Sequence, residues 1–151
     1  MMLFINRDNA ERISGVIDEL TVINYRTLTL GLYFLTIGTF LGAIWANESW
    51  GRYWGWDPKE TWSLITIIVY TLVTHSRMIP GMKDTYTFNL ISLFAFSSVL
   101  MTYFGVNYYL SGLHSYAAGD PVPVPSFVYV AVTVLVLLAA GAGYRYRKAG
   151  R

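Results

Sequence analysis

No charged residue interrupts residues 27–47, which read TLTLGLYFLTIGTFLGAIWAN. Similar charge-free runs lie between Glu60 and Arg77, between Asp84 and Asp120, and between Asp120 and Arg145. A helix needs about 20 mostly apolar residues to cross the hydrocarbon core of a bilayer. The pattern therefore predicts four membrane spans, at residues 26–45, 60–79, 86–107 and 126–144.

The overall composition favours the same fold class. Hydrophobic residues make up 54% of the chain and charged residues 13%, against about 25% charged residues in a typical soluble domain. These shares exclude a disordered chain and an ordinary cytosolic enzyme. The chain has no cysteine, which excludes a disulfide scaffold, a Cys-ligated metal and covalent attachment of haem to this chain. The net charge of +2 is too small to indicate nucleic acid as a partner. We expect an all-α, polytopic membrane protein.

The basic residues indicate how the spans are oriented, because cytoplasmic loops carry an excess of Lys and Arg. With the N-terminus in the cytoplasm, nine of the eleven basic residues lie inside. Only Arg52 and Lys59 then lie outside. Both termini are therefore predicted to be cytoplasmic, and the segments 46–59 and 108–125 to face the other side.

The chain divides into three predicted parts. Residues 1–24 carry charges among apolar residues at helical spacing, as in an amphipathic helix at the cytoplasmic interface. Residues 25–118 form the membrane core. Residues 119–151 add a last span with a basic tail. In the first span, Gly31, Gly38 and Gly42 lie at helical spacing and would let another helix pack closely.

All five tryptophans fall within residues 45–62, which read WANESWGRYWGWDPKETW. An aromatic belt at the membrane interface explains part of this clustering. The order Asp57-Pro58-Lys59-Glu60 is also typical of a helix start. The alternative is a flat aromatic platform for a planar apolar ligand such as a porphyrin, with indole N–H groups and basic side chains meeting carboxylates at its edge. The candidate binding residues are Trp45, Trp50, Arg52, Tyr53, Trp54, Trp56, Asp57, Lys59, Glu60 and Trp62.

Some of these candidates also have simpler roles. Asp57 and Glu60, like Glu48, would hydrogen-bond indole or capping N–H groups rather than act as an acid or base. Arg52 and Lys59 would be solvated loop charges unless carboxylates of a ligand lie near them.

The chain has two histidines, His75 and His114. An ionisable residue within a membrane is a candidate functional residue, although a lone buried histidine is more often a hydrogen-bonded core residue. His75 follows Glu60 by 15 residues, or about 22 Å of helix, and lies towards the inner end of the second span. His114 lies beyond the third span, on the side of the tryptophans. The two are too far apart to hold one planar cofactor, so they would mark two separate stations.

The segment WGRYWGWDPKETW (residues 50–62) resembles the tryptophan-rich "WWD" signature of a haem-handling protein family. Its Asp-Pro-Lys-Glu-Thr-Trp ending is similar to the CcsA branch, also called ResC, of System II cytochrome c biogenesis. Flanking segments at 25–27, 45–48, 103–107 (YFGVN) and 112–116 (GLHSY) resemble the same branch. The likeness covers residues 18–116.

The resemblance implies a function at the bacterial cytoplasmic (inner) membrane. His75 would be an intramembrane axial ligand of haem iron and His114 an outer one. The Trp-rich loop would hold non-covalent haem b for thioether attachment to the CxxCH thiols of apocytochrome c. The chain would thus be part of a multi-subunit haem lyase without a catalytic residue of its own, since the reactivity belongs to haem and thiols.

Members of this branch have further spans before the WWD region. The resemblance therefore implies two partners: a CcsB/ResB-like companion subunit, and a chain carrying the N-terminal half unless that half is lost. Two alternatives remain open. One is a haem-holding or structural subunit of a respiratory complex, and the other is a haem-free assembly subunit.

Overall fold

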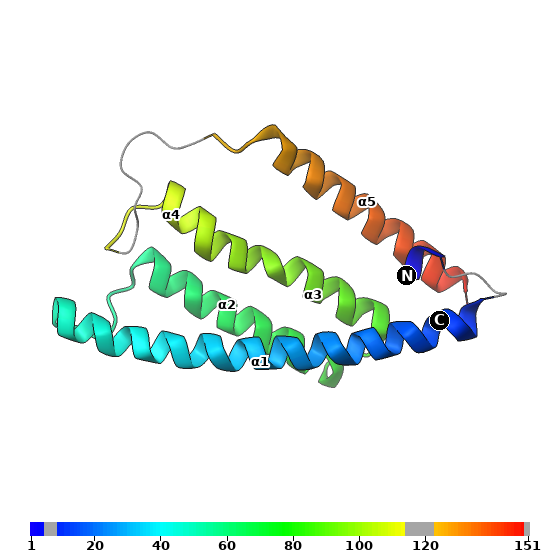
Figure 1. Ribbon diagram of the computed structural model, residues 1–151, viewed down its shortest axis with the longest axis horizontal. Helices are drawn as coiled ribbons and strands as arrows, with labels where there is room; N and C mark the ends of the chain where they lie inside the picture. The colour runs from blue at the N-terminus through cyan, green and yellow to red at the C-terminus, as the bar shows by residue number, and fades with distance from the viewer. Residues whose placement is uncertain (5–8, 114–122, 150–151) are drawn as a thin grey trace.

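The computed structural model describes residues 1–4, 9–113 and 123–149, and every regular element in these ranges is helical. The longer helices run roughly side by side (Figure 1). The elements are η1 (Met2–Phe4), α1 (Ala10–Trp50), α2 (Pro58–His75), η2 (Ser76–Met78), α3 (Thr85–Leu100), η3 (Met101–Gly105), α4 (Val106–Tyr109) and α5 (Ser126–Lys148). The predicted all-α class is confirmed.

Among the described residues, three helical stretches are long and apolar enough to cross a membrane: Glu11–Trp50, Thr85–Tyr109 and Ser126–Lys148. They correspond to the first, third and fourth predicted spans. The second predicted span forms α2, which is not among the three. With 18 residues, α2 is about 27 Å long, just under a hydrocarbon core of about 30 Å, and its first turn carries Lys59 and Glu60.

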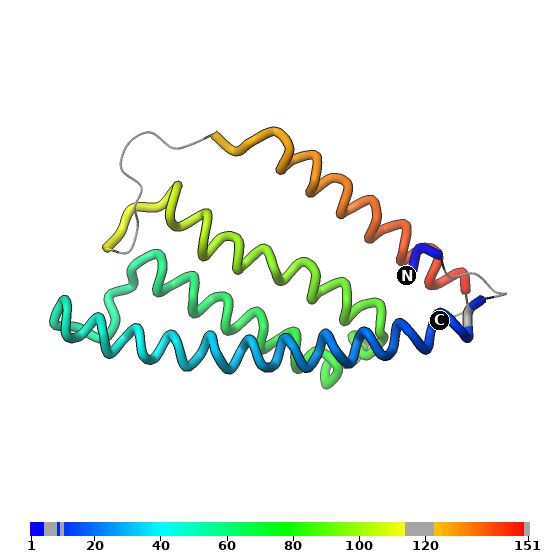
Figure 2. The backbone as a smooth tube through the Cα atoms, viewed as in Figure 1, coloured from blue at the N-terminus to red at the C-terminus, as the bar shows by residue number. Residues whose placement is uncertain are grey.

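The N-terminal segment continues directly into the first span. The structure has one helix of 41 residues from Ala10 to Trp50, which includes most of the predicted N-terminal helical segment. Figure 2 shows this helix as a single, gently curved element. Residues 10–50 contain no proline that would break this helix. The placement of residues 1–24 at the cytoplasmic interface stays a prediction.

The core lies between α2 and α3, where Val73, Phe88 and Ala95 are buried. Leu28 of α1 packs against this cluster. Beside it, Asn89 of α3 donates to Thr21 Oγ1 and accepts from Asn24 Nδ2. These hydrogen bonds hold the first half of α1 against α3 without exposing polar groups to lipid.

A π-helix, η3, follows α3 without a break. It begins at Met101, whose carbonyl accepts the Val106 N–H five residues later. Within η3, Thr102 Oγ1 lies 2.9 Å from Thr66 Oγ1 and 3.2 Å from the Trp62 carbonyl. These contacts connect the π-helix to the first half of α2.

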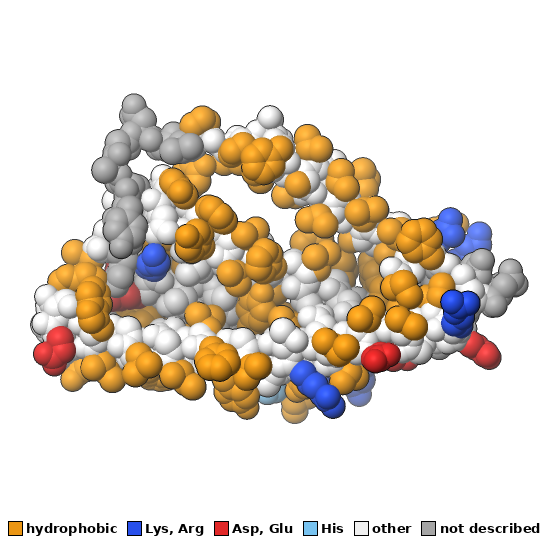
Figure 3. Space-filling model, in the orientation of Figure 1, with side chains coloured by type: hydrophobic (Ala, Val, Ile, Leu, Met, Phe, Trp, Pro, Cys, Tyr) orange, Lys and Arg blue, Asp and Glu red, His pale blue; other side chains and the backbone are white. Residues whose placement is uncertain are grey.

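Helix α5 lies against the other helices near its C-terminal end. Tyr86 of α3 donates to the Ala139 carbonyl, and η1 also packs on α5. Towards its start, α5 diverges from α3 (Figure 2), and the space-filling view shows an opening between them (Figure 3). Exposed apolar side chains cover much of the molecule, as expected where lipid or other subunits surround it.

Candidate functional site: the Trp loop and the α1–α2 groove

The loop that joins α1 to α2 is shorter than the Trp-rich segment suggested. Trp45 and Trp50 belong to the last turns of α1, and Trp62 belongs to α2. The connection is therefore residues 51–57, here called the Trp loop. It starts at Gly51, which ends α1 with a left-handed φ of 72° and donates to the Asn47 carbonyl at 2.8 Å. Glycine adopts this conformation without steric cost.

The loop ends in a capping box. The Asp57 carboxylate accepts the Lys59 N–H, and the Glu60 carboxylate accepts the Asp57 N–H at 3.2 Å. Pro58 occupies the first turn, where its missing N–H costs nothing. The predicted helix start is confirmed.

Glu60 also fixes the backbone on both sides of Trp56. Its Oε2 accepts from Gly55 N at 2.7 Å as well as from Asp57 N. Between these two amides, Trp56 has a φ of 57°, which is rare for a residue with a side chain and costs about 1–2 kcal/mol. The Trp56 side chain is 71% exposed. The unfavourable backbone conformation of Trp56 therefore holds its indole outward from the loop.

Asp57 connects the Trp loop to the segment after α4. This carboxylate is buried, and its second oxygen accepts the Leu113 N–H at 2.6 Å. Gly112 lies so close that a Cβ there would overlap Asp57 Oδ1 and lie 2.8 Å from Pro58 Cδ. Lys59 makes a parallel connection, because its Nζ donates to Asn107 Oδ1 of α4 at 3.1 Å.

The indoles do not form one flat platform. Trp45 and Trp50 pack edge to face with ring centroids 5.0 Å apart, and Trp54 and Trp56 do so at 5.9 Å. The interplanar angles are 80° and 87°. Edge-to-face packing is the favoured geometry of isolated aromatic pairs. The result is a set of aromatic walls at right angles rather than a continuous surface.

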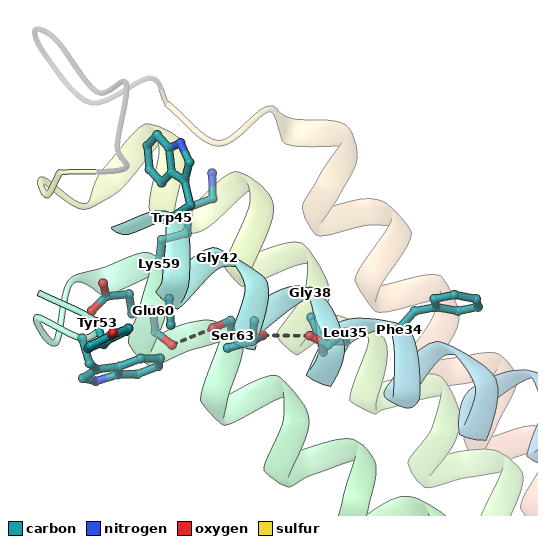
Figure 4. A pocket seen from close by; sticks show the side chains of 12 residues that line it. Phe34, Leu35, Gly38, Gly42, Trp45, Tyr53, Lys59, Glu60 and Ser63 are labelled. Carbon is teal, nitrogen blue, oxygen red and sulfur yellow. Dashed lines mark hydrogen bonds between the residues drawn. The ribbon is translucent and has the colours of Figure 1, made fainter. Parts of the chain in front are cut away.

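A groove of about 480 Å³ opens beside this loop, between α1 and α2. It is mainly apolar, and Figure 4 shows Trp45 and Tyr53 at its loop end and Phe34 at its far end. Five of the predicted site residues line it, namely Trp45, Tyr53, Trp54, Lys59 and Glu60. Trp50 and Trp56 reach the site through their indole partners. Arg52 extends over Gly55, and Trp62 is bonded to the π-helix through its carbonyl.

The α1 wall of this groove is not among the binding residues predicted from the sequence. Phe34, Gly38 and Gly42 line it, together with Leu35, Thr39 and Ala43. A Cβ on Gly38 or Gly42 would meet no described atom within 4 Å, so these glycines leave space open instead of packing against a helix of this chain. The available signal was their spacing of four residues, one turn, on a face that approaches α2.

The two predicted metal ligands are placed unequally. His75 is the last residue of α2, at the end opposite the Trp loop, and its ring is exposed. Its Nδ1 lies 2.8 Å from the Thr71 carbonyl oxygen. Because a carbonyl only accepts, Nδ1 is the donor, and in the neutral ring this tautomer leaves the lone pair on Nε2. His114 lies outside the described residues.

Replacing Glu60 with alanine should loosen the Trp loop. The change removes the acceptor of Gly55 N and Asp57 N, so Trp56 loses the restraint on its left-handed backbone. We expect a loss of about 1–2 kcal/mol in unfolding free energy. We also expect a weaker exciton couplet from Trp54 and Trp56 in circular dichroism. Glu48→Ala, which removes an exposed carboxylate near the end of α1, should change neither.

Comparison with known proteins places this geometry in a family. Residues 3–114 match the model of the family described as cytochrome C assembly protein. The chain is 56% identical to Protein NrfI of Wolinella succinogenes over 124 residues, 82% of this chain and 14% of that protein. It is 45% identical to cytochrome c biogenesis protein CcsA of Gloeobacter violaceus, over 71% of this chain and 31% of that protein. CcsA of Marchantia polymorpha is 48% identical over 67% of this chain and 31% of its own length.

This chain thus spans a third or less of the length of these relatives. The matched residues include α1 to α4, the Trp loop and the groove, whereas α5 lies beyond them. The chain belongs to the cytochrome c assembly protein family.

Proposed function

We propose that this protein is a haem-binding membrane component of cytochrome c biogenesis, which presents haem b at the Trp loop for attachment to apocytochrome c. The observation that carries the proposal is the clamped loop beside the groove, in a chain of the cytochrome c assembly family. Exposed aromatic side chains there, such as Tyr53 and Trp56, leave the site open to a second protein. That openness favours handing a ligand on over a buried electron carrier.

The residues present suit such a ligand. The aromatic walls and the apolar groove offer contact to a planar ring, and Lys59 Nζ lies at the groove where a propionate would need a positive partner. Bound haem supplies the vinyl groups to which cysteine thiols add. The contribution of this chain is to bind and orient the ring.

His75 suits an axial ligand. Within the described ranges, no group of three or more His, Asp or Glu side chains gathers to hold a free metal ion, so an isolated histidine fits iron that a macrocycle already holds. The Thr71 carbonyl accepts the Nδ1 proton and leaves Nε2 of the neutral ring as the atom for iron. Since the His75 ring lies on the surface of this chain, we infer that a CcsB/ResB-like companion subunit supplies the opposing ligand. His114 stays a predicted outer ligand.

The proposed locations follow the same reasoning. The protein would lie in the bacterial cytoplasmic membrane with both ends inside, placing the Trp loop outside. Charges agree with this orientation, because Lys and Arg side chains gather around the end where α5 finishes and α1 begins (Figure 3).

The test is pyridine haemochrome quantitation on the purified protein together with the subunits that copurify. His75→Ala should lower total haem per protein by the share that the inner station holds, which is about half if each of the two stations binds one haem, because loss of the ligand removes the iron bond. Met78→Ala is the control, since Met78 is 77% exposed near the same helix end and is not an assigned ligand. Undiminished haem in His75→Ala, or equal loss in both variants, would refute the assigned ligand. A wild-type complex without haem would refute the function.

A further inference from the structure

A second cavity, of about 570 Å³, lies where the end of α5 meets the start of α3. It is lined by Tyr86, Ala140, Gly143, Tyr144, Arg147 and Lys148. It is remote from the Trp loop, and most of its lining comes from α5, which lies beyond the residues matched by the family model. The proposed haem function makes no use of it.

The floor of this cavity is fixed by Tyr86. Its hydroxyl donates to the Ala139 carbonyl at 2.9 Å, and its ring stacks on Tyr146, a buried residue, at 5.8 Å with an interplanar angle of 27°. A Cβ on Gly143 would lie 2.6 Å from Tyr86 Oη, so glycine is what allows this close approach. The cavity therefore has a rigid, aromatic base.

The rim of the cavity is basic. Arg147 and Lys148 both line it, and Lys148 Nζ lies 5.9 Å from the centroid of the Tyr144 ring. Asp84, the N-cap of α3, is the acidic group that faces Arg147. Partial burial acts to raise the pKa of Asp84, but hydrogen bonds from Thr87 and the charge of Arg147 outweigh it and lower that pKa. Asp84 thus stays ionised and offsets part of the positive charge.

Two features indicate an amphipathic anion. The cavity lies at the end of a helix long and apolar enough to cross a membrane, and the end of such a helix is expected to reach the phospholipid headgroups. Its basic rim adjoins small residues, Gly143 and Ala140, one and two turns further into the span. Basic pockets between membrane helices are typical sites for acidic lipid headgroups. We propose that this cavity binds the phosphate of an anionic phospholipid and thereby anchors α5 to the bundle.

The test uses the full chain in a neutral detergent with added phosphatidylglycerol, with bound lipid counted by native mass spectrometry. Arg147→Ala/Lys148→Ala should weaken phosphatidylglycerol binding about tenfold or more, at about fivefold for each basic residue. Asp84→Asn should strengthen phosphatidylglycerol binding about two- to fivefold. Asparagine keeps the helix cap but removes the negative charge that faces Arg147.

The matched control is Lys83→Ala/Arg145→Ala, which removes two charges from the same end of the molecule without altering the cavity lining. Equal weakening by both double variants would mean general charge attraction and would overturn the proposal. Equal binding of phosphatidylcholine would do the same. Displacement of the lipid by inorganic phosphate would assign the cavity to free phosphate instead of a lipid.

Discussion

Replacing Gly38 and Gly42 with leucine should lower haem retention at the Trp loop about tenfold or more while the protein still folds. Both glycines line the groove, and neither has a described atom within 4 Å of its missing Cβ. Two leucine side chains would fill the space that a planar ligand needs, with steric penalties of about 1–3 kcal/mol each. The measurement is haem per protein in a His75→Ala background, in which the remaining haem is held at the Trp loop. The variant with both leucines is compared with the same background without them.

The control for this experiment is Gly15→Leu/Gly31→Leu. These glycines lie on the same helix and are equally open, but neither lines the groove. The control variant should keep its haem. If the groove-filling variant also keeps its haem, with normal helicity and a single peak in size exclusion, the ligand does not occupy the groove. If both variants lose haem equally, α1 instead contacts another subunit through its whole glycine-bearing surface.

The second large effect is expected from Gly112→Ala. The added methyl group would overlap Asp57 Oδ1, so the segment after α4 must move away from the Trp loop. This movement breaks the hydrogen bond from Leu113 N and leaves a buried carboxylate short of a donor. We expect a loss of about 2–4 kcal/mol in unfolding free energy, from overpacking and the lost charged hydrogen bond together. Thermal unfolding in detergent measures it as a lower midpoint.

Gly55→Ala is the matched control for Gly112→Ala. A Cβ on Gly55 would meet the guanidinium of Arg52, at 2.7 Å from its central carbon, and this flexible side chain can swing away. The cost should stay below about 1 kcal/mol. Similar midpoints for Gly112→Ala and the wild-type protein would show that the contact between Asp57 and the α4 segment carries little stability.

Much of this fold follows from charge spacing alone. Uninterrupted apolar runs predict α1, α3 and α5, because a span is a one-dimensional property of length and hydropathy. The capping box at Asp57 is likewise local, so four consecutive residues suffice to predict it. The merging of residues 10–24 into α1 was not predictable in this way. The charges in residues 10–24 mark the end of the apolar run but do not mark the end of the helix, and contacts such as those of Thr21 and Asn24 with Asn89 join distant parts of the sequence.

In the candidate site, too, local features could be predicted from the sequence and contacts between distant residues could not. A cluster of five tryptophans indicates an aromatic site from sequence, but the pairing of the indoles depends on the backbone. Trp45 meets Trp50 because α1 extends to Trp50, and Trp54 meets Trp56 beside a left-handed residue in the loop. The groove needs two helices to define it, so its glycine wall becomes visible only in three dimensions. The role of His75 likewise depends on Thr71, one turn earlier, whose carbonyl fixes the ring.

The π-helix η3 sets the direction in which the side chains of α4 point. Each residue turns an α-helix by about 100°, so the one extra residue in a π-turn rotates the chain beyond Gly105 by about that angle. Asn107 then faces Lys59, and Gly112 arrives at Asp57. Deleting one residue within 101–105 would barely change the hydropathy or length of this span. It would nevertheless turn both contacts away from the Trp loop. A segment whose composition suggests only a membrane span therefore determines whether Asn107 and Gly112 reach the site.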